Sequence, residues 1–297
     1  MAHPLLNELM TEHRAFLWFG RRLGAPAAVA LVIHGLNFKP AKMAAIIDVL
    51  NCADVLVLNL SLQGHGNNFV PAGAGYRQDR LKAFKSVSAD LWRAETAAAY
   101  RRVNALADHL GVPIIFCGYS MGGLLGMDLL LHDSQAHFDR MLLFAPALAI
   151  RRFWRIVVGS FDLWPQLTLP NRFLRPAVAP YLANRGTPVA AYKALFEMET
   201  NFYDRLFTLG PRLNRPTLLM INPRDELLSP KRIARQIKSA ELSQWQMHFI
   251  HPKGPQTTKT LHHLIIDPAT VDPAVWHQAT QKIRAFLATP SYAQGEY

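Results

Sequence analysis

Apolar runs without strict alternation of apolar and polar residues recur along the chain. Strands buried on both faces of a parallel sheet have this pattern, whereas half-exposed strands alternate. The sequence therefore predicts a mostly parallel sheet with most of its strands in the interior. The predicted strands are residues 27–35, 54–62, 112–120, 140–148, 216–223 and 245–251.

Helical patterns separate most of these strands. The longest of them, 86–110, ends at Gly111, and glycine commonly follows the last residue of a helix. The final pattern begins after Asp272-Pro273, which is a helix start signal. Strands that alternate with helices indicate an α/β fold with helices on the faces of the sheet. The predicted helices are residues 40–51, 86–110, 122–132, 230–240 and 273–288.

One interval interrupts this alternation. The segment between Leu148 and Thr217 is much longer than a connection between neighbouring parallel strands requires. It is rich in Arg, Trp, Phe and Pro, and its later part has a helical pattern. We therefore expect a core domain made of residues 1–148 and 211–297, with a helical cap or lid, residues 149–210, inserted over the end of the sheet.

Composition and charge describe an ordinary folded protein with a basic surface. The chain has 297 residues, 50% of them hydrophobic, which is enough for one sizeable core. Its net charge of +11 raises the affinity for anions. The basic residues are dispersed, however, and no nucleic-acid-binding motif accompanies them, so we expect no nucleic-acid partner.

The cysteines and the N-terminus favour a cytoplasmic protein. Cys52 and Cys117 each lie in an apolar run, and buried free thiols suit a reducing compartment. Charged residues interrupt the apolar N-terminus, unlike a signal peptide, and no apolar stretch is long enough to span a membrane.

The segment Gly118-Tyr119-Ser120-Met121-Gly122 follows a predicted strand and precedes a predicted helix. In this context G-x-S-x-G places a serine at the apex of a sharp turn above the sheet. Glycine, which has no Cβ, allows neighbouring backbone to approach the turn closely, and the helix N-terminus favours negative charge. Ser120 is therefore the candidate nucleophile, and the alternative is an ordinary glycine-rich turn, such as a nucleotide-binding one.

With this motif the chain resembles the α/β-hydrolase superfamily, and more narrowly its monoglyceride lipase, lysophospholipase-like and carboxylesterase members. The resemblance extends from about residue 27 to the C-terminus, outside the interval 149–210. It implies an α/β-hydrolase fold, in which helices flank a mostly parallel sheet and the cap follows the sixth strand of the family.

The resemblance also implies an oxyanion hole. His34-Gly35-Leu36 matches the H-G pair that opens the oxyanion loop of the family. It assigns the backbone N–H groups of Leu36 and Met121 to the oxyanion and assigns His34 to orienting the loop. A second glycine-rich match, Gly64-His65-Gly66, lacks the usual acidic residue before it, so we interpret it as a structural turn.

Two further segments match the acid and the base of the family. Asp225 follows a predicted strand at the position of the acid, and Glu226 is the neighbouring alternative. His263 precedes Leu-Ile-Ile-Asp in the manner of the family histidine, and His262 is the alternative. The order Ser120, Asp225, His263 is that of this fold. The histidine pair has no third ligand at metal spacing, so we expect no metal.

The resemblance implies a serine hydrolase that cleaves carboxylic esters through an acyl-enzyme intermediate, without a cofactor. Thioester hydrolysis, acyl transfer, peptide cleavage or a non-catalytic binding role on the same fold are the alternatives. The aromatic residues of the cap favour a small ester substrate with an apolar acyl group, such as an acylglycerol or a lysophospholipid. Arginines among them suit peripheral contact with a membrane. These cap residues are Phe153, Trp154, Phe161, Trp164, Phe173, Phe196, Phe202 and Phe207, with Arg151, Arg152, Arg155, Arg172 and Arg175.

Overall fold

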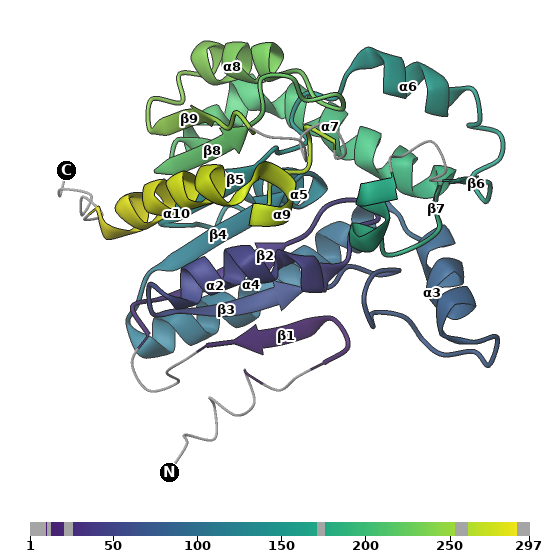
Figure 1. Cartoon of the computed structure of the whole chain (residues 1–297), viewed down its shortest axis with the longest axis horizontal. Helices are drawn as coiled ribbons and strands as arrows, with labels where there is room; N and C mark the ends of the chain where they lie inside the picture. The colour runs from purple at the N-terminus through teal and green to yellow at the C-terminus, as the bar shows by residue number, and fades with distance from the viewer. Residues whose placement is uncertain (1–9, 11–12, 21–25, 171–175, 253–260, 290–297) are drawn as a thin grey trace.

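The structure is a computed structural model that describes residues 10, 13–20, 26–170, 176–252 and 261–289. Its centre is a seven-stranded sheet with the strand order β1-β3-β2-β4-β5-β8-β9 (Figure 1). All neighbouring pairs are parallel except β1 and β3. The strands are β1 (Phe16–Phe19), β2 (Ala28–Ile33), β3 (Val55–Leu60), β4 (Ile114–Tyr119), β5 (Arg140–Phe144), β8 (Thr217–Ile221) and β9 (Trp245–Phe249).

The predicted parallel sheet is confirmed, and every predicted strand is present. Strands β2 to β5 and β8 are buried along their whole length, as their continuous apolar sequences require. β5 ends earlier than predicted, because the chain turns at Ala145, whose φ of 41° is outside the range of a strand. The antiparallel edge strand β1 was not predicted, since its four residues are too short to show a pattern.

Helices lie on both faces of the sheet. Figure 1 shows α2 and α10 in front of it and α4 behind it, and α5 packs beside α4. The predicted helix 86–110 begins at Ala89, because the Ser88 side chain accepts a hydrogen bond from the Leu91 N–H and caps the helix; it ends at Gly111 as predicted. The short helices α3 and α9 were not predicted. In the described residues, the α-helices outside the interval 149–210 are α2 (Ala44–Asn51), α3 (Tyr76–Lys85), α4 (Ala89–Leu110), α5 (Met121–His132), α8 (Pro230–Ser239), α9 (Pro268–Val271) and α10 (Pro273–Ala288).

The interval 149–210 contains an exposed part and a part that joins the core. Its long helix α7 packs against α5 and buries Met198, Phe202 and Leu206 in the main hydrophobic core. The shorter helix α6 buries only Val158 fully. The other elements among the described residues of this interval are a two-stranded ribbon and a 3-10 helix. Their bounds are α6 (Arg152–Gly159), β6 (Thr168–Pro170), η3 (Pro176–Tyr181), β7 (Gly186–Pro188) and α7 (Val189–Leu209).

The two cysteines differ in their surroundings. Cys117 is buried in β4, and burial raises the pKa of its thiol far above the ordinary value. Cys52 is exposed after the last residue of α2, so the expectation that both thiols are buried is wrong for Cys52. Its apolar neighbours in the sequence, Val49, Leu50 and Val55, are buried in α2 and β3, whereas Cys52 lies in the connection between these two elements. No helix in the described ranges is both long enough and apolar enough to cross a membrane.

Candidate active site

Ser120 occupies a strained turn between β4 and α5. Its φ of 52° and ψ of −117° are unusual for a residue with a side chain, and its N–H donates to the Phe144 carbonyl at 2.9 Å. A Cβ on Gly122 would lie 2.1 Å from the Ile33 carbonyl oxygen, and one on Gly118 would lie 2.5 Å from the Gly123 Cα. The two glycines of the motif are therefore required by close backbone packing, which brings the end of β2 against the start of α5.

Three residues predicted from different parts of the chain meet at this turn. The Ser120 Oγ lies 2.8 Å from the His263 Nε2. The His263 Nδ1 lies 2.8 Å from the Asp225 Oδ2. Ser120 is only partly buried, whereas His263 is 4% exposed and Asp225 is not exposed at all. The hydroxyl therefore stands at the accessible end of a buried chain of hydrogen bonds.

The surroundings of Asp225 favour its ionised form. Burial by itself raises the pKa of this carboxyl, but the His263 imidazole and the backbone N–H groups of Leu227 and Leu228 outweigh it, so the pKa is lowered overall. Both N–H groups donate to the Asp225 Oδ1 at 2.8 Å. One carboxylate oxygen is thus held by the loop, and the other is free to orient the imidazole.

The side chains of Glu226 and His262, which neighbour Asp225 and His263 in the sequence, make other contacts. The two carboxylate oxygens of Glu226 accept the backbone N–H groups of His262, at 3.0 Å, and of His263, at 3.2 Å. The His262 Nδ1 lies 3.3 Å from the Asn222 Nδ2. The structure therefore brings Asp225 and His263 to Ser120 and leaves Glu226 and His262 beside them. Sequence reasoning considered Glu226 only as an alternative acid and missed its contact with the histidine backbone.

The predicted oxyanion residues lie on the two segments that meet at Ser120. A Cβ on Gly35 would lie 3.1 Å from the Ser120 Cβ, so the turn that carries Leu36 adjoins the serine. Met121 is the first residue of α5, and a first-turn N–H has no acceptor within its helix. Both backbone segments can thus present N–H donors close to a group bound at the Ser120 hydroxyl.

Two buried histidines support the turn after β2. The His34 Nδ1 lies 2.8 Å from the Gly35 carbonyl, and its Nε2 accepts the Leu62 N–H. The His65 Nε2 accepts the Asn37 N–H at 2.9 Å. Burial lowers the pKa of His34 to about 4 and also lowers the pKa of His65, to which the nearby His34 contributes. Both rings are neutral at pH 7 and bind backbone, in the structural positions that the sequence analysis expected.

Asn37 connects this turn to the interval 149–210 and was not recognised in the sequence. Its side-chain amide nitrogen contacts the Asn184 carbonyl, the Gly186 carbonyl and the Thr187 hydroxyl, and its oxygen accepts the Asn184 N–H. Its φ of 50° is one that asparagine tolerates better than most residues. No sequence signal marks it, because its partners lie far away in the chain.

The fold and the site together define a serine hydrolase of the α/β-hydrolase fold, of the lipase- and esterase-like kind. Residues 24–253 match the family described as serine aminopeptidase, S33, and the chain belongs to that family.

Individual relatives are distant. The chain is 23% identical to human monoglyceride lipase over 274 residues, which cover 84% of each chain. A soluble variant of the Saccharomyces cerevisiae monoglyceride lipase has a TM-score of 0.72 at 10% identity, over 94% of this chain and 92% of the other. The Paleococcus ferrophilus monoacylglycerol lipase has a TM-score of 0.63 at 19% identity, over 92% and 97%. At these identities the solved structures establish the fold.

Proposed function

We propose that the protein hydrolyses carboxylic esters, with Ser120 as nucleophile, His263 as general base and Asp225 as the acid that orients the histidine. The observation that carries this proposal is the continuous contact from the Ser120 Oγ through the imidazole to the Asp225 carboxylate, with 2.8 Å at each step. This spacing suits proton transfer from the hydroxyl to the imidazole.

The proposed reaction has two stages. His263 takes the proton of Ser120 as the oxygen attacks the acyl carbonyl, and the ionised Asp225 stabilises the imidazolium that forms. The backbone N–H groups of Leu36 and Met121 bind the oxyanion. The imidazolium then protonates the departing alcohol, and a water molecule, deprotonated by His263, hydrolyses the acyl-enzyme. Each oxyanion donor typically contributes about 3 kcal/mol to lowering the barrier.

The proposed substrate is a small ester with an apolar acyl group, of the acylglycerol or lysophospholipid kind. Support comes from the relatives, which are named as monoglyceride and monoacylglycerol lipases. Residues 149–210 serve as the cap in this proposal, because Asn37 ties the part of this interval around Asn184 to the predicted oxyanion turn.

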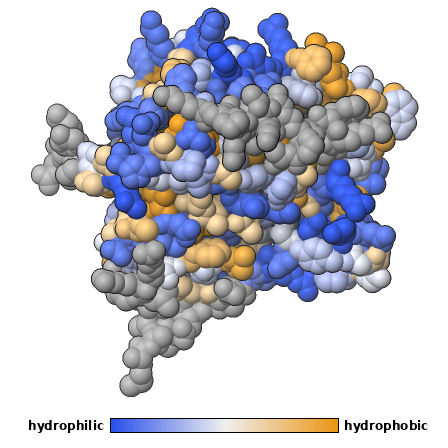
Figure 2. All heavy atoms as spheres, viewed as in Figure 1, coloured by the Kyte–Doolittle hydropathy of each residue, from blue (hydrophilic) through white to orange (hydrophobic). Residues whose placement is uncertain are grey.

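The cap is also the proposed contact with a membrane. Phe153 and Ile156 of α6 are 64% and 73% exposed, and Leu163 and Trp164 follow them at the surface. Figure 2 shows hydrophobic side chains gathered at the upper right, where α6 lies in Figure 1. Exposed apolar groups beside arginines favour an anionic interface. Phe173, Arg172 and Arg175 lie outside the described residues.

The experiment compares the wild type with Ser120→Ala on p-nitrophenyl esters of increasing chain length and on a fluorophosphonate probe. We expect ester turnover with an optimum at longer acyl chains, and loss of both turnover and labelling in Ser120→Ala. Ser134→Ala is the matched control, because Ser134 is exposed in the loop after α5, and it should react as the wild type does. Persistent labelling of Ser120→Ala would show that another residue is the nucleophile.

A second substrate class should be tested in the same experiment. Amino-acid p-nitroanilides test for the aminopeptidase chemistry after which the family is named. Turnover of the anilides above that of the esters would replace ester hydrolysis with peptide cleavage, and the same three residues would still be required.

A further inference from the structure

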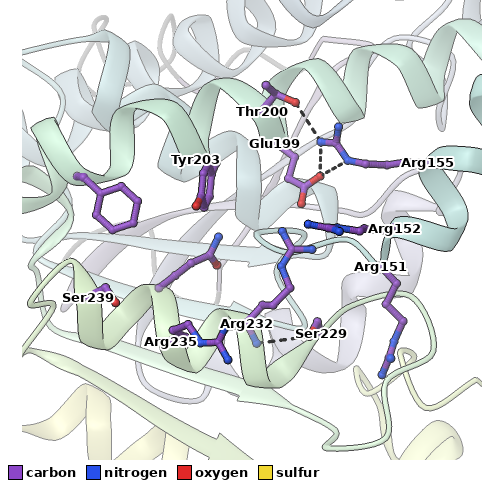
Figure 3. A pocket seen from close by; sticks show the side chains of 12 residues that line it. Arg151, Arg152, Arg155, Glu199, Thr200, Tyr203, Ser229, Arg232, Arg235 and Ser239 are labelled. Atoms are coloured by element: carbon purple, nitrogen blue, oxygen red, sulfur yellow. Dashed lines mark hydrogen bonds and ion pairs between the residues drawn. The ribbon is translucent and has the colours of Figure 1, made fainter.

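A cavity of about 820 Å³ lies among α6, α7 and α8, and Ser120, Asp225 and His263 do not line it. Figure 3 shows arginine side chains entering it from α6 and α8, across from the side chains of α7. Its volume is in the range of small-molecule sites. The arginines that line it are Arg151, Arg152, Arg155, Arg232 and Arg235.

The positive charge of this cavity is largely uncompensated. Among the described residues that line it, Glu199 is the single acidic one, and it is paired with Arg155, whose Nε lies 2.9 Å from the carboxylate. In the described part of the chain, the side chains of Arg152 and Arg235 have neither a hydrogen bond nor an ion pair. The Arg232 guanidinium donates to the Ile150 carbonyl. Three of the lining arginines, Arg152, Arg232 and Arg235, therefore have no carboxylate partner among the described residues.

Neighbouring elements add to this charge. Helix α8 carries Lys231 and Lys238 besides the two arginines, and it has no acidic residue. Arg151 extends away from the other arginines in Figure 3 and donates two hydrogen bonds to the Asp225 backbone carbonyl. The cavity is therefore electropositive. Arg151 lies between it and the loop that carries Asp225.

Positively charged groups that lie close together repel one another, and a bound anion offsets this repulsion. Guanidinium groups bind phosphoryl oxygens in pairs of parallel hydrogen bonds, which a chloride ion cannot accept in the same way. At the other end of the cavity, Tyr203 and Phe207 are 49% and 53% exposed and offer an apolar surface. The lining thus matches a phosphoryl group attached to an organic part.

We propose that the cavity between α6, α7 and α8 binds the phosphoryl group of a phosphate ester, through Arg152, Arg232 and Arg235, at a second site apart from Ser120. The phosphoryl group belongs either to a soluble phosphate ester or to the headgroup of a phospholipid. The proposal does not depend on ester hydrolysis, because the site shares no lining residue with the Ser120, Asp225 and His263 group.

Calorimetric titration of the full chain with inorganic pyrophosphate and with glycerol 3-phosphate tests the soluble source. Co-sedimentation with phosphatidylcholine vesicles, with and without phosphatidic acid, tests the lipid source. The double variant Arg152→Ala/Arg235→Ala should weaken binding at least tenfold in the arm that binds, because it removes two of the three guanidinium groups that hold the phosphoryl group. The variant Arg152→Lys/Arg235→Lys keeps the charge and should lose part of the affinity.

Arg205→Ala is the matched control, because Arg205 is an exposed arginine of α7 that does not line the cavity. It removes one positive charge outside the cavity, so it should bind the phosphate probes as the wild type does. The unfolding midpoints of this control and of the double variant should agree with that of the wild type. Binding by the wild type that the double variant retains, or no binding in either arm, would overturn the proposal. Neither result would bear on ester turnover, which is measured separately.

Discussion

Glu226 accepts the backbone N–H of His263 at 3.2 Å, while the side chain before it, Asp225, contacts the His263 ring at 2.8 Å. The second Glu226 oxygen accepts the His262 N–H. Two adjacent acids therefore fix one histidine, one through its backbone and the other through its imidazole. Removal of the Glu226 carboxylate and removal of the Asp225 carboxylate should therefore have different effects on activity.

Replacement Glu226→Ala should lower kcat/KM by about 10- to 100-fold, since a displacement of the imidazole by about 1 Å is enough for such a loss. The pH dependence of kcat/KM should stay as in the wild type, because the ring retains Asp225 as its partner. Glu226→Gln keeps one acceptor oxygen and should recover part of the activity. Wild-type turnover in Glu226→Ala would contradict a positioning role.

Replacement Asp225→Asn should reduce kcat by about 10³- to 10⁴-fold, because an amide cannot hold the required imidazole tautomer or stabilise its charge. The fold should persist, since the oxygen of the substituted amide can still accept the Leu227 and Leu228 N–H groups that bind Asp225 now. Steady-state kinetics and circular dichroism measure the two effects. A larger loss in Glu226→Ala than in Asp225→Asn would transfer the acid role to Glu226.

The free energy of unfolding should fall as the pH is lowered from about 6.5 to about 4. In this window the unfolded chain protonates His34 at its ordinary pKa of about 6.5, while the folded chain, with a pKa of about 4, does not. The destabilisation that His34 causes is absent above pH 6.5 and reaches about 3 kcal/mol of unfolding free energy at about pH 4. The lowered pKa of His65 acts in the same direction.

Urea unfolding over this pH range measures the effect. His34→Gln should flatten the dependence, whereas His277→Gln, at an exposed position of α10, should keep the wild-type slope. Equal slopes in the two variants would mean that other groups cause the acid sensitivity. The Asp225 carboxyl titrates below this window, because its pKa is lowered from an already acidic value.

Removal of the Asn37 side chain should loosen the connection between the turn after β2 and the segment 184–187. Asn37→Ala removes the buried hydrogen bonds that this side chain makes with Asn184 and Thr187, at a typical cost of about 1–3 kcal/mol of unfolding free energy. Hydrogen exchange around Thr187 should accelerate, and ester turnover should decrease.

The variant Asn37→Gly distinguishes the effect of the lost side-chain contacts from the effect of backbone strain. Glycine loses the same hydrogen bonds but adopts the positive φ without strain, so it should be more stable than Asn37→Ala. Unchanged hydrogen exchange in both variants would show that the side chain does not hold the segment.

The sequence determined the sheet, because strands buried on both faces must be apolar along their length, and this pattern is local. It also marked Ser120, since the Gly118 and Gly122 positions admit no Cβ. It did not reveal α3, whose sequence is mostly polar and which buries only Asp79 and Phe84. Nor did it reveal β1, which is defined by its pairing with β3 and not by its own residues.

Tertiary structure alone assembled groups that lie far apart in the chain. The family pattern favoured Asp225 over Glu226 and His263 over His262 by position, but it could not show what each side chain contacts, because adjacent side chains point in different directions. The exposure of Cys52 and the contacts of Asn37 depend on packing in the same way. Arg152 and Arg235 come together because α6 and α8 flank one cavity, a proximity that no local pattern encodes.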